Sequence, residues 1–172
     1  MHTFNLVLLL GSVAVLVAGQ AESYTVTFSK PTTFATANSN TLFANGVSPA
    51  LPLSQFTFSA ARGVNFESGQ PDTKPYLTTP FSIIRPVDVY SSELLLAMTT
   101  SATFPTVNVR SSQNANKGYT FTGVQVVGYQ HQKQDGIALE QIQLSSESLQ
   151  VNYPMLTGTG VDQVRWDIGA AA

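Results

Sequence analysis

Carboxylates are the side chains in this sequence best suited to chemistry, because two of them on either side of a sugar bond could hydrolyse it. The candidates are Glu67, Asp72, Asp88, Glu93, Glu140 and Glu147. Their spacing does not select a pair. Asp88 precedes the strongest helix formers and is typical of a helix cap, whereas Glu140 is typical of a strand-face charge or an ion pair between subunits. We therefore predict that the protein is not an enzyme.

Nucleophiles and metal ligands are scarce. Cysteine is absent, and His131 is the only histidine after residue 21, so a zinc site would lack its nitrogen and sulfur ligands. His131 stands in a polar stretch, residues 130–136, that predicts a solvated turn. The run Gly46-Val47-Ser48 resembles part of a nucleophile elbow, but the final glycine of that motif is missing. We expect no metal and no cofactor.

The composition is poor in charge. Eight basic and ten acidic residues give a formal net charge of -2, and no Lys/Arg cluster is present that could neutralise a run of phosphates. Nucleic acid is therefore excluded as an expected partner. Charged residues make up 10% of the chain, against roughly 25% in an average soluble domain. Long helices usually carry Glu and Lys on their solvated side, so this composition favours β-sheets.

The first 21 residues are typical of an export signal. Residues 6–18 form an apolar run of the length of a signal-peptide core, which is short for a membrane span. We predict a secretory signal peptide over residues 1–21, with cleavage after Gly19 or Ala21, and a single secreted domain over 22–172 without membrane contact. No Lys or Arg precedes the run, so a membrane anchor remains the alternative.

The rest of the chain shows the patterns of β-strands. Alternation of apolar and polar residues, or a short apolar run, recurs at intervals. It occupies residues 24–28, 56–58, 81–84, 107–109, 119–129, 142–144, 149–153 and 164–168. The Thr-, Asn- and Pro-rich segment 31–52 predicts a long loop or a loosely attached hairpin, and 62–75 predicts a second connection.

Two local signals refine these strands. The apolar parity slips around Gly123 and again at Val126-Val127, which predicts bulges. Asp135-Gly136 predicts the turn of a hairpin.

One helix is predicted, over residues 91–98, with Asp88 as its cap. Leu94, Leu95 and Met98 are expected to face the core. The fold class is therefore all-β and mainly antiparallel: a small β-barrel with one flanking α-helix.

The stretch FSIIRPVDVYSSELLL, residues 81–96, resembles the strand, the "K/R-x-Val-Asp" element and the Leu-rich helix of the haemolysin-coregulated protein (Hcp) family. The likeness continues through residues 119–129 and 140–144. It also includes residues 165–168, Arg-Trp-Asp-Ile, which resemble an "aromatic-Asp-aliphatic" closing element. In all, the resemblance extends over roughly residues 56–168.

The resemblance implies a structural protein that forms hexameric rings. In the family these rings stack into the inner tube of the type VI secretion apparatus, carry effector cargo in the lumen and meet other components of that apparatus. For this chain it implies a homo-oligomer, with Trp166 and Ile168 expected at the subunit interface. The alternative is a secreted monomeric binding module for a carbohydrate or a cell-surface protein, with the 31–52 loop and Tyr76, Tyr90 or Tyr153 as the contact surface.

Overall fold

The computed structural model describes residues 22–31, 41–43, 45–64, 71–77, 80–154 and 161–168. For residues 41, 60–64, 71–77, 166 and 167 it describes the backbone alone. The predicted signal peptide and Glu67 therefore lie outside the described residues, as do the side chains of Asp72, Tyr76 and Trp166.

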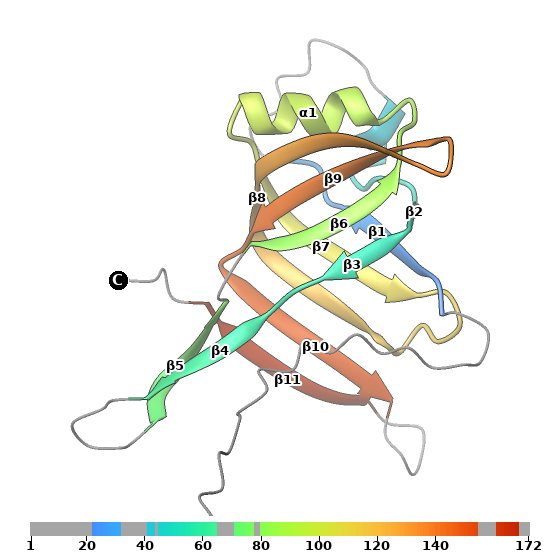
Figure 1. Ribbon diagram of the computed structural model, residues 1–172. Helices are drawn as coiled ribbons and strands as arrows, with labels where there is room; N and C mark the ends of the chain where they lie inside the picture. The colour runs from blue at the N-terminus through green and yellow to red at the C-terminus, as the bar shows by residue number, and fades with distance from the viewer. Residues whose placement is uncertain are drawn as a thin grey trace, which may run out of the picture.

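Eleven strands and one α-helix make up the described fold. The main sheet contains β1 (Tyr24–Phe28), β2 (Leu51–Leu53), β3 (Gln55–Thr57), β6 (Phe81–Pro86), β7 (Thr103–Ser111), β8 (Gly118–Gln134), β9 (Ile137–Ser145), β10 (Ser148–Pro154) and β11 (Val161–Asp167). The strands β4 (Ala60–Val64) and β5 (Pro71–Leu77) form a separate hairpin that projects from the sheet (Figure 1). The helices are α1 (Ser91–Thr99) and a short 3-10 helix, η1 (Thr41–Phe43). The all-β, antiparallel fold class with one α-helix is thus confirmed for the described residues.

The main sheet rolls up without a ladder between its first and last strands. Its strand order is β2-β1-β7-β8-β9-β6-β3. The two end strands are consecutive in the chain, because only Ser54 separates β2 from β3. The amide of Ser54 donates to the carbonyl of Ile84 on β6 at 2.8 Å. The sheet is therefore not closed into the predicted barrel by hydrogen bonds among the described strands; the chain passes from one edge of it to the other at Ser54, pairing with β1 before that residue and with β6 after it.

The long strand β8 pairs with β7 along one edge and changes its partner along the other edge. Its first part pairs with β10 and its second part with β9. Gly123 lies between the two parts with φ +59°, where a Cβ atom would meet the Glu147 side chain at 2.4 Å, so this position requires glycine. The register shifts between Val126 and Gly128, which confirms the bulge predicted there.

The register explains why one face of the sheet is apolar and the other polar. One row across β1, β7, β8 and β10 reads Val26, Val109, Tyr119 and Val151, and the next apolar row reads Phe28, Val107, Phe121 and Leu149. The rows between them read Thr27, Asn108, Thr120 and Gln150, and Thr25, Arg110, Gly118 and Asn152. The inward rows supply the core, while hydroxyl and amide groups form most of the outer face.

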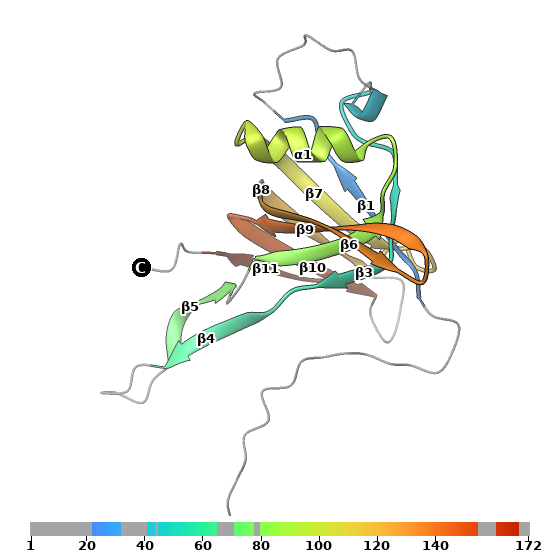
Figure 2. The same ribbon diagram turned by 45° about the horizontal axis from the view of Figure 1, so that its top comes forward.

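Helix α1 lies across one end of the rolled sheet (Figure 2). Leu94 and Ala97 are fully buried and belong to the core cluster, which also holds stacked rings of Phe81 and Phe121 with centroids 3.8 Å apart. Met98 is partly buried against the same core. Leu95, predicted to face inward, is 39% exposed, because the buried face of this helix runs through positions 91, 94 and 97.

Two connections contain more structure than predicted. Within segment 31–52 the described part includes η1, a bridge from Val47 to Ser29, and the start of β2. The predicted connection 62–75 contains most of the β4–β5 hairpin. Among the described residues, no helix has the length and apolar character needed to span a membrane.

Candidate functional site

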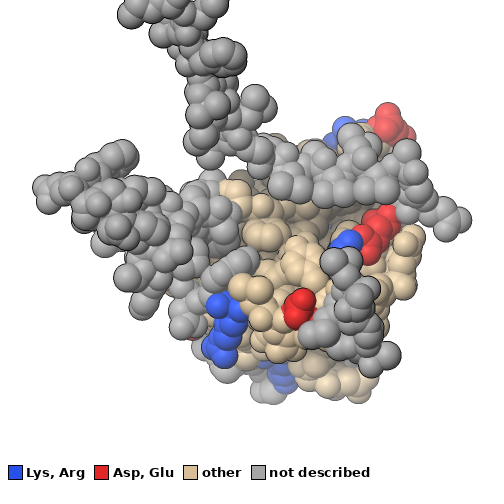
Figure 3. All heavy atoms as spheres, turned by 90° about the horizontal axis from the view of Figure 1, so that it is seen from below, with Lys and Arg blue, Asp and Glu red and all other residues tan. Residues whose placement is uncertain are grey.

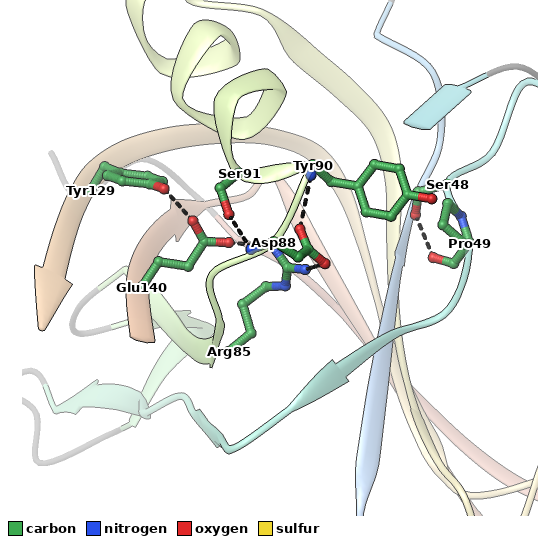
Figure 4. A network of polar contacts seen from close by, with 8 residues as sticks. All are labelled: Ser48, Pro49, Arg85, Asp88, Tyr90, Ser91, Tyr129 and Glu140. Carbon is green, nitrogen blue, oxygen red and sulfur yellow. Dashed lines mark hydrogen bonds and ion pairs between the residues drawn. The ribbon is translucent and has the colours of Figure 1, made fainter. Parts of the chain in front are cut away.

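A charge cluster, Arg85, Asp88, Tyr129 and Glu140, lies at the barrel end beneath α1 (Figure 4). Arg85 on β6 and Glu140 on β9 are directly opposite each other and both fully buried. The Arg85 guanidinium forms an ion pair with Glu140 through Nη1 and another with Asp88 through Nη2. The cluster therefore contains one cation and two carboxylates, of which Glu140 is fully buried and Asp88 is partly exposed.

Asp88 connects this cluster to the start of α1. Its carboxylate accepts the backbone amide of Tyr90 at 2.9 Å, and its own amide donates to Ser91 Oγ at 3.0 Å. The N-cap position is Tyr90, which makes no side-chain capping bond. The predicted capping role of Asp88 is thereby corrected: its carboxylate closes the turn before the helix and holds Arg85 instead of accepting a helix amide.

Tyr129 extends the cluster toward the surface. Its hydroxyl donates to Glu140 Oε2, and burial, followed by this hydrogen bond, raises the pKa of Tyr129 above its usual range. His131 Nε2 lies 3.1 Å from the same hydroxyl. Because the hydroxyl proton already goes to Glu140, His131 must be the donor in that contact. His131 is exposed but belongs to β8, not to the solvated turn that was predicted.

Several of the predicted chemical groups that the structure describes are engaged in the fold. Glu140 pairs within its own chain, so its two predicted roles, a strand-face charge and a partner in an ion pair between subunits, are both corrected by its burial. Ser48 is buried, accepts the amide of Phe28 and donates to the carbonyl of Pro49, both at 2.9 Å. Glu93 is buried in α1, where burial raises its pKa. No group of three or more His, Cys, Asp or Glu side chains in the described residues is placed to hold a metal ion.

Sequence reasoning missed Arg85 and Tyr129. The signal for Arg85 was present: in residues 81–86 it shares the inward parity of Phe81 and Ile83, and a charged residue at such a position needs a buried partner. Nothing in the local pattern indicates that Glu140 is that partner, because the pairing of β6 with β9 joins distant parts of the chain.

A second group of ionic contacts, the amino-terminal clamp, consists of Glu22, Tyr24, Ser111 and Lys117. Glu22 accepts hydrogen bonds from Lys117 Nζ at 2.5 Å, Ser111 Oγ at 2.5 Å and the Tyr24 hydroxyl at 2.9 Å. The hydrogen bond from Lys117 is the main reason that the pKa of Glu22 is lowered. The side chains of Glu22 and Lys117 remain partly exposed.

Strand β11 carries the predicted subunit contacts. Among the described strands it forms a ladder with β10 alone and is therefore an edge strand of the main sheet. Trp166 lies opposite Leu149 in the register, and Val164, opposite Val151, is 45% exposed. Ile168 follows the strand, donates its amide to the carbonyl of Glu147 at 2.7 Å and packs partly against the core.

The other predicted contact residues are dispersed. Tyr90 is partly buried against the core near α1, whereas Tyr153 on β10 is 45% exposed. Seen from below, charged side chains are scattered and most of the described surface is uncharged (Figure 3).

Comparison with known proteins places this geometry in a known fold. No protein-family model matches the chain, and no curated protein matches its sequence. Among solved structures, one described as an Hcp protein superimposes with a TM-score of 0.63 and 15% identity, covering 87% of this chain and 100% of that chain. A type VI secretion system effector from Yersinia pestis gives a TM-score of 0.61 and 16% identity, covering 84% of this chain and 99% of that one.

The secreted protein Hcp3 from Pseudomonas aeruginosa gives a TM-score of 0.56 and 12% identity, covering 87% of this chain and 100% of that chain. Identities this low carry the fold alone, and in each case nearly the whole of the other protein is covered. The resemblance inferred from residues 81–96, 119–129, 140–144 and 165–168 is thus confirmed at the level of the fold: the chain has the fold of the Hcp proteins.

Proposed function

We propose that this protein is a secreted structural protein that assembles into rings of six copies, similar to the inner tube of type VI secretion systems, and that it has no catalytic activity. The fold likeness to Hcp proteins over most of the chain carries this proposal. The domain begins at Glu22, after removal of residues 1–21, and continues to residue 172. Effector cargo or other components of a secretion apparatus are the partners that this role implies.

The edge of β11 supports self-association. An edge strand such as β11 can add a strand or a sheet edge from another copy. The strand contains no Pro, a residue that commonly protects such edges. We place the subunit interface along β11, with Trp166 and Ile168 at one end of it and Val164 near its middle.

The test is the mass of residues 22–172 in solution, measured by size-exclusion chromatography with light scattering and followed by negative-stain imaging. We expect rings of about six copies. Val164→Lys, at the proposed interface, should shift the mass toward the monomer. The matched control is Val127→Lys, because Val127 is 49% exposed on β8 and lies away from the β11 edge.

A monomer at all concentrations would contradict the ring. It would favour the secreted binding module, for which Tyr153 is the more exposed of the two predicted contact tyrosines whose side chains are described, Tyr90 and Tyr153. If the two lysine substitutions changed the mass equally, the ring would still be supported, but the subunit interface would not lie along β11.

A further inference from the structure

Arg110 lies on the polar outer face of the main sheet, where the described residues offer it no opposite charge. The strands β1, β7, β8 and β10 lie side by side there (Figure 1), and the row through Arg110 reads Thr25, Arg110, Gly118 and Asn152. The neighbouring row consists of hydroxyl and amide residues, so neither row contains Asp or Glu on these four strands. The ion pairs described above are made by Arg85 and Lys117 instead.

Neutral groups hold the guanidinium of Arg110. Its Nη2 donates to Thr120 Oγ1 at 3.2 Å and to Asn108 Oδ1 at 3.4 Å, and Thr120 Oγ1 donates to the same Asn108 oxygen at 2.9 Å. Its Nη1 is buried and has no hydrogen-bond partner. Both contacts of Nη2 are long for a charged donor, so the guanidinium loses little when it turns toward a negatively charged ligand.

Gly118 provides the space in which the Arg110 side chain lies. A Cβ atom at position 118 would lie 2.4 Å from the carbonyl oxygen of Val109, 2.6 Å from Arg110 Nη1 and 2.8 Å from Arg110 Cδ. The arginine side chain therefore lies across the backbone of β8 at the one position of its row that has no side chain. This arrangement keeps the guanidinium close to the sheet, between Thr120 and Asn108.

Burial without an opposite charge is unfavourable for an arginine. Arg110 is half-buried, and burial lowers its pKa. A buried donor without a partner calls for a group that completes its hydrogen bonding, and for a cation the most favourable group is an anion. Since the two rows supply only neutral groups, that anion has to come from another molecule.

A carboxylate fits this arrangement better than a phosphate group does. The planar fork of a guanidinium matches the two oxygens of a carboxylate, and one arginine balances one negative charge. Partners rich in phosphate are bound by several Lys and Arg residues together, and the two rows contain no second cation on these four strands.

We propose that the outer face around Arg110 binds a protein partner through a side-chain carboxylate of that partner. The guanidinium pairs with the carboxylate, while Thr120 and Asn108 position the guanidinium. This site lies on a face of the sheet, whereas the subunit contact proposed above lies at the edge of β11. The two proposals are therefore independent, and either can fail without the other.

The experiment compares two capped peptides that differ in one group, acetyl-Gly-Glu-Gly-amide and acetyl-Gly-Gln-Gly-amide. Each is added in increasing concentration, at constant ionic strength, to protein purified after expression of the full chain. The measurement is the midpoint of thermal unfolding. We expect the Glu peptide to raise the midpoint saturably, by about 3 °C at ten times its Kd, and the Gln peptide to leave it unchanged.

Two variants test whether Arg110 is responsible. Arg110→Gln should abolish the difference between the peptides. Arg110→Lys keeps the charge but loses the planar fork, so it should raise the Kd of the Glu peptide at least about fivefold. Lys133→Gln is the matched control, because Lys133 is an exposed cation on β8 outside the two rows, and it should respond as the parent does. The midpoint of each variant without peptide shows that it is folded.

Three results would overturn the proposal. The first is an equal response, or none, to the Glu and Gln peptides. The second is a response to the Glu peptide that survives in Arg110→Gln. The third comes from inorganic phosphate: a saturable rise at lower concentrations than the Glu peptide requires would identify a phosphate site instead of a carboxylate site.

Discussion

The two ionic groups of this molecule show how position decides what the same chemistry contributes. The charge cluster beneath α1 pairs Arg85 with Glu140, both fully buried. The amino-terminal clamp pairs Glu22 with Lys117, both partly exposed. A buried pair has lost its water, so each charge depends on the other, whereas an exposed pair can exchange its partner for water. The cluster should therefore be indispensable to the fold and the clamp only a local attachment.

The largest loss of stability should follow from the removal of one buried charge. Glu140→Gln leaves Arg85 with Asp88 alone and should lower the free energy of unfolding by about 3 kcal/mol, the lower end of the range for broken buried pairs. Denaturant titration of residues 22–172 measures it. The double variant Arg85→Met with Glu140→Leu should recover most of the loss. If the double variant is no more stable than the single one, an uncompensated charge is not the cause.

A smaller loss is expected from Tyr129→Phe. The substitution keeps the ring and removes the hydrogen bond to the buried carboxylate of Glu140, which should cost about 1–3 kcal/mol of unfolding free energy. Tyr153→Phe serves as the control at an exposed tyrosine. Equal losses from the two variants would contradict the special position of Tyr129 in the cluster.

The amino-terminal clamp should contribute still less to the stability of the fold. Lys117→Gln should lower the free energy of unfolding by less than about 1 kcal/mol, and the loss should shrink as salt screens the exposed pair. Repeating the titration at low and high salt tests both points. A loss as large as that of Glu140→Gln would remove the contrast between the two groups.

The smallest expected effects on stability come from the carboxyl groups of Glu22 and Glu93. Their contributions should change with pH in opposite directions. The pKa of Glu22 lies below its ordinary value of 4.5 because of Lys117, so its contribution to stability is present above that pH and is lost as the pH falls through the lowered value. The pKa of Glu93 is raised by burial, so the fold gains stability from Glu93 as the pH falls toward 4.5.

Both signs can be read from glutamine variants compared with the parent. At neutral pH, Glu22→Gln should be less stable than the parent and Glu93→Gln more stable, and both differences should fade in acid. The measurement is the free energy of unfolding between about pH 3 and about pH 7. Differences of the same sign would show that one of the two environments is misassigned.

The sequence was informative where a pattern is local. The helix over residues 91–98, the hairpin turn at Asp135-Gly136 and the bulge beside Val127 each follow from neighbouring residues, and all three are found. The strands β4 and β5 were missed because Pro71 and Pro75 are typical of loops, although a two-stranded hairpin can hold proline at its edges.

The charge cluster was only partly predictable. Asp88 was recognised as important for the start of α1, but its partner Arg85 and the link from Glu140 to Tyr129 depend on strand pairings between distant residues. A pattern of alternation tells which side of a strand faces inward. It does not tell which two strands will be neighbours, and that is what pairs one buried charge with another.

The junction at Ser54 has a consequence for how the molecule folds. A single segment of seven residues, β2 and β3 with Ser54 between them, must find two partners that belong to different strands, Val26 on β1 and Ile84 on β6. Neither half can reach its register until the other strands have brought those partners to the two sides of one gap. Closing the gap therefore waits for the ladders of β1 with β7 and of β6 with β9, and these more distant pairings should limit the folding rate of the whole domain.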